Sequence, residues 1–246
     1  IVFAFLCVNQ QTAYATDWIK GDLVSGLSIG TAGRTRLVFD EDGEPHIFYN
    51  QSDDLSHIYR DSSGWQSTEE LISSDLAYFE LYRVTSESFH ISYFNSDGCD
   101  NVDYGNFDDD TLDTEGVYSS CGNLGSKSAV AIDSEGNPYV ALTYSTTNTI
   151  YYSKFEEEAW TATEIDTGAS PTSIVMDIDS DDNVHVVYSI SSSGTYYLLY
   201  YSSSNPSSVY EITNGTSSFS YLSLAIDSED TLHVAYLDNS SRELMY

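Results

Sequence analysis

Apolar and polar residues alternate with a period of two along most of the chain, in short runs separated by Gly, Asn, Asp and Ser. This pattern predicts short β-strands joined by tight turns, because successive side chains of a strand point to opposite faces of a sheet. No segment shows the 3.6-residue period of an amphipathic helix. We therefore expect an all-β protein.

One phrase recurs along the chain: an apolar strand that ends in Asp, a tight polar turn, and a second strand that begins near His. Residues 82–93 hold a degenerate copy that is one residue shorter. The clear copies are residues 37–49, 130–142, 176–188 and 224–236. Such internal repetition is the signature of a repeat architecture.

Four columns of similar residues recur with a period of about 47 residues. The turn column is Asp40, Asp133, Asp179 and Asp227, with Thr85 in the degenerate copy. The second-strand column is His46, His90, Tyr139, His185 and His233. The third-strand column is Tyr59, Tyr104, Tyr152, Tyr201 and Tyr246. The fourth-strand column is acidic: Asp22, Glu69, Glu115, Glu164 and Glu211.

Four strands in a unit of 40–50 residues are typical of a propeller blade. We predict a five-bladed β-propeller of four-stranded antiparallel blades over residues 16–246. The first strand in the chain, residues 17–24, has the pattern of a fourth strand. We expect it to close the ring by pairing into the last blade, which removes two unpaired sheet edges. The expected blades span about residues 34–72, 79–119, 127–166, 173–213 and 221–246 together with 17–24.

The first fifteen residues have the features of a secretory signal peptide. An apolar run over residues 1–8 precedes Ala13-Tyr14-Ala15, an A-x-A cleavage pattern. The run is too short to span a bilayer, so we expect no membrane insertion. The alternative, a lipoprotein anchored through Cys7, is disfavoured by the A-x-A site. We expect a secreted protein, extracellular or periplasmic, that is a monomer or part of a longer surface protein.

Removal of the leader takes Cys7 with it and leaves Cys99 and Cys121. An even number of cysteines in an oxidising compartment predicts one disulfide between them. The loop that it closes is worth about 3 kcal/mol in the chain-entropy model.

The formal net charge is −31, from 39 acidic residues against 8 Lys and Arg. A surface this acidic repels phosphate backbones and anionic membranes, which excludes nucleic-acid binding. Cationic partners, divalent metals and neutral sugars remain compatible with it. Solubility alone is the simpler explanation of the charge.

Small residues fill the first strand of several units, as expected next to a crowded propeller axis: Ser128, Ala129, Ala131, Ser223 and Ala225. Asp177 stands in that column at a position where the other units have Val38, Arg83, Ala131 and Ala225. We expect Arg83 and Asp177 to face each other across the channel and to bind a polar ligand or ion. The alternative is a solvated or water-bridged pair.

Carboxylates cluster in the irregular second unit, where Asp97, Asp100 and Asp103 surround Cys99. Such a cluster on a disulfide-held loop is either a set of solvated acids or a Ca²⁺ site, since Ca²⁺ takes six to eight oxygen ligands. The spacing does not match an EF-hand. No other cofactor is expected. We interpret the histidine column as a repeated structural hydrogen bond, because residues one blade apart on outer strands cannot converge on one ion.

The phrase I-D-S-E-G-N-P-Y at residues 132–139, followed by a Y-Y-S strand and a Trp-led strand, resembles the blades of secreted bacterial propellers of the sialidase-like and BNR type. The resemblance covers residues 17–246 and implies the fold. The Asp box of that family, S-x-D-x-G-x-T-W, is not matched. Sialidase chemistry needs three Arg around a substrate carboxylate, and Arg60 and Arg242 fall on outer strands, which argues against it.

Near-equal blades favour a non-catalytic recognition module that binds a glycan or a protein, since catalysis makes one face asymmetric. The alternative is a glycoside-active hydrolase or lyase with carboxylates at the channel mouth. A purely structural domain of a longer surface protein is a third interpretation.

Overall fold

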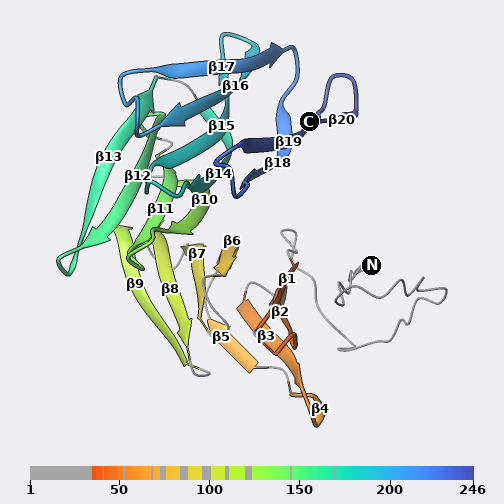
Figure 1. The fold of residues 1–246 in the computed structure, drawn as a ribbon. Coiled ribbons are helices and arrows are strands. Elements are labelled where there is room, and N and C mark those ends of the chain that lie inside the picture. The colour runs from red at the N-terminus through yellow and green to blue at the C-terminus, as the bar shows by residue number, and fades with distance from the viewer. Residues whose placement is uncertain are drawn as a thin grey trace.

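A computed structural model describes residues 35–246, apart from 41, 52–53, 68, 73–75, 84–87, 96–100, 109–110, 120–123, 145 and 169. The described chain forms twenty strands and no helix, in five antiparallel sheets arranged as a ring (Figure 1). The five-bladed β-propeller expected from the repeats is confirmed. No helix of the described residues is long and apolar enough to cross a membrane.

Each blade follows the chain from an inner strand outward. Blade 1 holds β1 (Thr35–Phe39), β2 (Pro45–Gln51), β3 (Asp54–Asp61), β4 (Gly64–Trp65) and β5 (Glu69–Ile72). Blade 2 holds β6 (Leu76–Arg83), β7 (Phe89–Asn95), β8 (Asn101–Asp108) and β9 (Thr111–Ser119). Blade 3 holds β10 (Leu124–Ile132), β11 (Pro138–Tyr144), β12 (Thr149–Glu156) and β13 (Ala159–Thr167).

The last two blades continue the pattern. Blade 4 holds β14 (Ser170–Ile178), β15 (Val184–Ser192), β16 (Thr195–Ser202) and β17 (Val209–Gly215). Blade 5 holds β18 (Phe219–Ile226), β19 (Leu232–Asp238) and β20 (Glu243–Met245). The closing strand expected over residues 17–24 lies outside the described residues.

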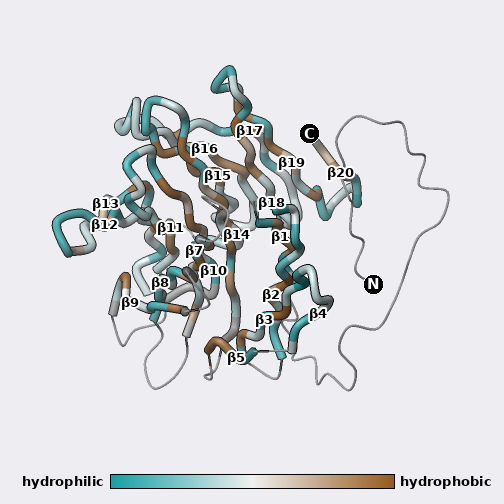
Figure 2. The backbone as a smooth tube through the Cα atoms, turned by 60° about the horizontal axis from the view of Figure 1, so that its bottom comes forward, coloured by the Kyte–Doolittle hydropathy of each residue, from teal (hydrophilic) through white to brown (hydrophobic). Residues whose placement is uncertain are grey.

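The core lies between neighbouring blades. Ala129 and Ala131 of β10 are buried against Met176 of β14 and Tyr188 of β15. The small alanine side chains let the larger residues of the next blade approach, as close packing requires. Hydrophobic residues concentrate on the strands and hydrophilic ones at the turns (Figure 2). Each buried Leu, Ile or Phe in these layers contributes about 1.5–3 kcal/mol.

Candidate functional site

The turn aspartates organise the hairpins between the first and second strands. In blade 4, Oδ1 of Asp179 accepts the backbone N–H of Asp181 at 3.0 Å and that of Asn183 at 2.8 Å. A carboxylate that bonds the backbone two to four residues ahead fixes a tight turn. The same bond to the fourth residue recurs in blades 1, 3 and 5, which explains the Asp column of the repeat.

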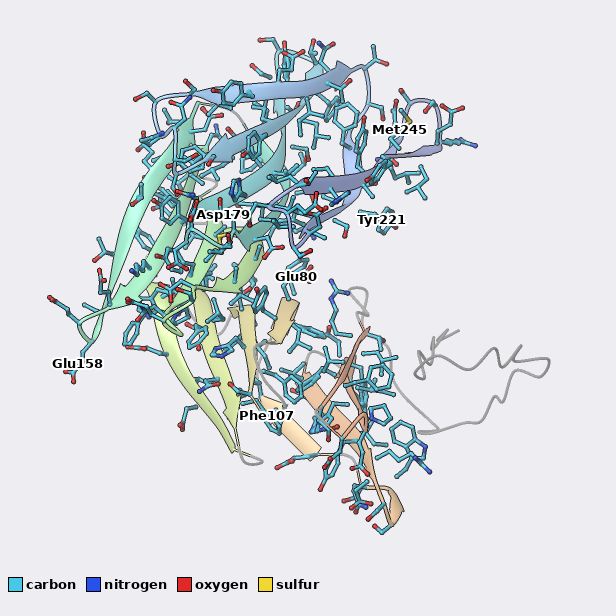
Figure 3. The ribbon with its side chains drawn as sticks, viewed as in Figure 1. Glu80, Phe107, Glu158, Asp179, Tyr221 and Met245 are labelled. Carbon is cyan, nitrogen blue, oxygen red and sulfur yellow. The ribbon has the colours of Figure 1, made fainter. Side chains whose placement is uncertain are left out.

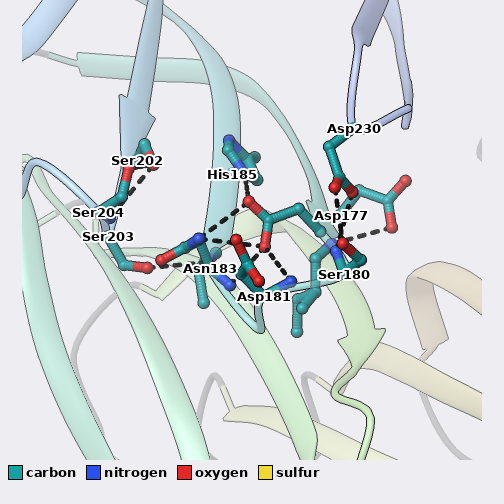
Figure 4. A network of polar contacts seen from close by, with 12 residues as sticks. Asp177, Ser180, Asp181, Asn183, His185, Ser202, Ser203, Ser204 and Asp230 are labelled. Carbon is teal, nitrogen blue, oxygen red and sulfur yellow. Dashed lines mark hydrogen bonds and ion pairs between the residues drawn. The ribbon is translucent and has the colours of Figure 1, made fainter. Parts of the chain in front are cut away.

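A histidine links the turn of blade 4 to the third strand. His185 contacts Oδ2 of Asp179 through Nε2 at 2.8 Å and the hydroxyl of Tyr200 through Nδ1 at 2.7 Å (Figure 4). Because the carboxylate only accepts, Nε2–H donates to it and Nδ1 accepts from the tyrosine. With Asn183 and His185 as its partners, Asp179 has a pKa below its ordinary value although burial opposes the shift.

The arrangement repeats with variations. In blade 5, His233 joins Asp227 at 3.0 Å to the hydroxyl of Tyr246. In blade 2, His90 contacts Ser88 and Tyr104. These contacts confirm that the histidine column is structural.

Blade 3 replaces the histidine by Tyr139. There Lys154 lies 3.6 Å from Asp133 and 5.4 Å from the centre of the Tyr139 ring. The basic group that faces the turn carboxylate therefore comes from the third strand in this blade.

Blade 1 replaces the tyrosine by a second histidine. Nε2 of His57 lies 3.0 Å from Nδ1 of His46, whose Nε2 is 3.6 Å from Asp40. When Nδ1 of His46 is the acceptor, as Nδ1 of His185 is, His57 donates to it through Nε2–H. Nδ1 of His57 then carries a lone pair, and it has no hydrogen-bond partner among the described residues. His57 is fully buried, and desolvation together with His46 lowers its pKa to about 3.

The tyrosine column expected from the sequence does lie on the third strands of blades 1 to 4, but two of its members are not structurally equivalent to the others. The ladder places Tyr59 opposite His46, so the equivalent of Tyr104 is His57. In blade 4 the equivalent is Tyr200 and not Tyr201. Differences in hairpin length between blades shift the pairing away from a constant count along the chain.

The inner-strand column given by the ladders differs in one member from the column expected from the sequence. The residues that pair with the second-strand column are Val38, Tyr82, Ala131, Asp177 and Ala225. Tyr82, and not Arg83, is thus the blade 2 counterpart of Asp177, because Tyr82 lies eight residues before His90, as Asp177 lies eight residues before His185. Arg83 pairs with Phe89 at the end of β6, and its side chain lies outside the described residues.

Asp177 forms a cross-ring contact. Its carboxylate accepts the backbone N–H of Ile178 at 3.0 Å, and the Tyr82 hydroxyl of blade 2 and the backbone N–H of Ile226 of blade 5 lie near enough to favour its charged form. Tyr82 passes the small residues of blade 3 to reach it and packs on the core between blades 3 and 4. Burial raises the pKa of the Asp177 carboxyl, although these donors and His185 oppose the shift.

A second polar cluster joins the inner strands of the first three blades. Arg36 of β1 donates to Oε2 of Glu80 on β6, at 3.0 Å from Nε and 2.5 Å from Nη2. Oε1 of the same carboxylate accepts the Tyr78 hydroxyl at 2.5 Å. Lys127 of β10 lies 4.5 Å from the centre of the Tyr78 ring. Glu80 points from β6 towards the centre of the ring (Figure 3).

Serine–aspartate clamps connect the turns of blades 3, 4 and 5. Ser134 bonds both carboxylate oxygens of Asp182 at 2.8 Å, through its backbone N–H and its hydroxyl. Ser180 bonds Asp230 in the same way, at 3.0 and 2.6 Å. The two aspartates have φ of 60° and 58°, a region that Asp adopts more readily than most residues. These clamps were not predicted from the sequence, although its Asp-Ser pairs at the turns are a signal for them.

Most of the predicted metal and disulfide residues fall outside the described residues: Asp97, Cys99, Asp100 and Cys121. Asp103 is described on β8, where it faces Gly116 and contributes to raising the pKa of Tyr93, which burial also raises. Among the described residues, no group of three His, Cys, Asp or Glu is placed to hold a metal ion. The Ca²⁺ site and the disulfide stay predictions.

Comparison with solved structures identifies the architecture. An ulvan lyase of polysaccharide lyase family PL25 superposes with a TM-score of 0.57 at 10% identity, over 82% of this chain and 61% of that one. This protein is a β-propeller. The chain thus spans less than two thirds of the lyase.

Two further propellers superpose at similar levels. The endo-arabinase of Bacteroides thetaiotaomicron gives a TM-score of 0.52 at 11% identity, over 86% of this chain and 92% of that one. The leech intramolecular trans-sialidase gives 0.51 at 9% identity, over 83% and 38%. No family model and no curated protein matches the propeller's sequence. At these identities the likenesses show the fold alone.

Proposed function

We propose that this propeller is an extracellular, non-catalytic recognition module that binds a glycan at one mouth of its channel. The residues proposed to contact the ligand are the polar side chains of the inner strands: Arg36, Glu80, Tyr82 and Asp177. They break the repeat, whereas the turn aspartates and the histidines follow it. A ligand site needs such local asymmetry, since repeated positions serve the fold in every blade.

The proposal rests on the position of Asp177, a carboxylate in the inner-strand column. Its column is otherwise apolar apart from Tyr82, and burial raises its pKa, so the carboxylate costs stability where it stands. Ionisable groups held at a cost to stability concentrate at functional sites. Carboxylate, guanidinium and phenol groups together supply the acceptors, donors and flat surface that hydroxylated ligands require.

The repeated polar groups do not supply catalytic groups. His185 and Asp179 satisfy each other and the turn, as do His233 and Asp227. A glycosidase needs an acid and a second carboxylate that are both free to meet the substrate. These pairs do not meet that requirement.

One observation favours the enzymatic alternative. A carboxyl group with a raised pKa is what a general acid requires, and Asp177 has one. A hydrolase or lyase acting at the channel mouth would use it in that role.

A glycan array separates the two functions. Residues 16–246 are tested with and without about 1 mM Ca²⁺, together with Asp177→Asn, Arg36→Gln and the control Glu211→Gln on β17. Saturable binding that is lost in the first two variants and kept in the control supports the recognition module. Shortened or unsaturated products in mass spectra of the bound glycans would support the enzyme. Glycan binding by Asp177→Asn at the wild-type level would contradict a ligand site at Asp177.

A further inference from the structure

His57 lies in the hydrophobic layer between blades 1 and 2. Its ring stacks on that of Phe48 with the ring centres 4.5 Å apart, and it meets the Phe107 ring of blade 2 edge-on at 5.0 Å (Figure 3 labels Phe107). The side chain of His57 is fully buried. Blade 2 supplies the other side of the layer: Phe79, Phe89, Ile91, Tyr93 and Phe107. None of these side chains is charged in acid. A titratable ring thus forms part of the contact between two blades.

The hydrogen bonds of His57 suit the neutral ring alone. Nε2 lies 3.0 Å from Nδ1 of His46, and Nδ1 of His57 has no hydrogen-bond partner among the described residues. A neutral imidazole fits this arrangement, because Nε2–H donates and Nδ1 carries only a lone pair. A protonated imidazole has an N–H on each nitrogen, so the one on Nδ1 would be buried without an acceptor.

The titratable groups that face His57 within blade 1 offer little compensation for a positive charge. His46 on β2 is itself a base, and Asp40 lies beyond it, 3.6 Å from Nε2 of His46. Tyr59 on β3 stacks on His57 at 5.5 Å and is uncharged in acid. Glu69 on β5 stands opposite His57 in the ladder, but its side chain is exposed to water, which screens its charge.

The position of His57 holds a tyrosine in blades 2, 3 and 4. The ladders align it with Tyr104, Tyr152 and Tyr200. A phenol gains no proton in acid, so this position stays neutral in those blades as the pH falls. Acid therefore acts on this position of the repeat in blade 1 and not in the other three.

An ion pair joins the inner strands of the same two blades. Arg36 of β1 donates to Oε2 of Glu80 on β6, at 3.0 and 2.5 Å. Blades 3, 4 and 5 are linked by the serine–aspartate clamps in addition to their core. Separation of blade 1 from blade 2 would break the Arg36–Glu80 pair and leave the clamps intact.

We propose that the contact between blades 1 and 2 is an acid-sensitive switch, in which protonation of His57 opens this interface while blades 3 to 5 stay folded. When the layer opens, water reaches Nδ1 and both N–H groups of the imidazolium are hydrated. Closure then requires the ring to lose its proton. Opening of one part of a fold below the free energy of global unfolding is a general property of proteins.

The direction of the pH effect follows from where the proton binds better. In the closed layer the pKa of His57 is about 3 against 6.5 ordinarily, because burial, and then His46, disfavour its charged form. The open form therefore binds the proton more tightly, and a falling pH favours it. The equilibrium constant for opening should rise about seventyfold from pH 7 to 4.5.

Hydrogen–deuterium exchange tests the switch. Peptides from β2, β3 and β7 are compared with peptides from β11 and β15 at pH 7 and 4.5, after correction for the intrinsic exchange rate at each pH. We expect the protection of the first group to fall by more than tenfold and that of the second group to change by less than threefold. A uniform loss of protection in all blades, or no loss in any, would overturn the proposal.

Three variants show whether His57 is the group that responds. His57→Tyr installs the residue of the other blades, and His57→Gln is a smaller neutral replacement. Both should abolish most of the acid response, whereas the control His233→Gln, at an exposed histidine of the column, should keep it. An undiminished response in the folded His57 variants would overturn the proposal. If neither variant folds, the wild-type exchange pattern decides the question by itself.

One consequence rests on the glycan proposal, in which Arg36 contacts the ligand. Wild type should then bind its glycan more weakly at pH 4.5 than at pH 7, and His57→Tyr should lose less affinity over the same range. The exchange experiment contains no ligand. Acid opening in exchange without any such difference in binding would therefore count against Arg36 as a ligand contact and not against the switch.

Discussion

His57 on β3 and Tyr200 on β16 occupy the same position of the repeat. Each bonds Nδ1 of the histidine on the preceding strand, at 3.0 Å for His46 and 2.7 Å for His185. A phenol cannot gain a proton near neutral pH, whereas an imidazole can. The exchange therefore gives blade 1 a group that can gain a proton at this position of the repeat, where blade 4 has a phenol.

The pKa of His57 is about 3 in the fold against 6.5 ordinarily. Between these values the unfolded chain binds a proton that the folded chain does not, so the free energy of unfolding falls as the pH drops. The contribution of His57 to the slope of the unfolding free energy against pH approaches about 1.4 kcal/mol per pH unit between pH 6 and 4. Urea unfolding of wild type and His57→Tyr across this range should show a smaller slope in the variant. Equal slopes of the unfolding free energy against pH in the two proteins would contradict the lowered pKa of His57.

His185 is buried between Asp179 and Tyr200, whereas His233 makes the same contacts at the surface. His185→Ala removes one hydrogen-bond partner from the half-buried Asp179 carboxylate and one from the Tyr200 hydroxyl, and we expect it to cost about 1–3 kcal/mol in urea unfolding. His233→Ala is the matched control, because water replaces the lost contacts there. Equal costs would show that burial does not decide the strength of this contact.

The Ser180–Asp230 clamp joins blades 4 and 5 through two hydrogen bonds to one carboxylate. In a double-mutant cycle of Ser180→Ala and Asp230→Asn, we expect a coupling energy of about 0.5–1 kcal/mol, because the clamp is exposed. Asparagine keeps the left-handed backbone conformation available, so only the contact changes. Strict additivity of the two substitutions would show that the clamp is energetically silent.

Tyr82→Phe removes the cross-ring donor to Asp177. The remaining carboxylate has fewer hydrogen bonds to its charged form, so its already raised pKa should rise further. A carboxyl whose pKa is raised in the fold is destabilising above that pKa, and its contribution becomes favourable as the pH falls through it. Asp177→Asn should therefore leave stability at pH 7 within about 1 kcal/mol of wild type or higher. Carbon-13 titration of the carboxyl and urea unfolding measure the two effects, and a lower pKa in Tyr82→Phe would refute the hydrogen bond.

The ladder between β8 and β9 bears on the disulfide. Asn101 pairs with Ser119 at the end of this ladder, and each cysteine lies two residues along the sequence from one member of the pair. We expect both thiols to resist alkylation until the protein is reduced. Reduction should lower the free energy of unfolding by about 3 kcal/mol. Rapid alkylation of either cysteine in the unreduced protein would exclude the bond.

The sequence by itself determined the all-β class, the five units, the Asp-led turns and the structural role of the histidines. These follow from local rules, namely the period-two alternation and the side-chain chemistry of tight turns, which repeat wherever the residues repeat. Only the tertiary structure decided that Tyr82 and not Arg83 aligns with Asp177, and that His57 replaces a tyrosine. Blade 2 lacks the turn Asp, so a count along the chain has no fixed starting point there, and the hairpins between second and third strands differ in length. The hydrogen-bond ladder fixes the true neighbours, and a shift of one residue turns a side chain to the other face.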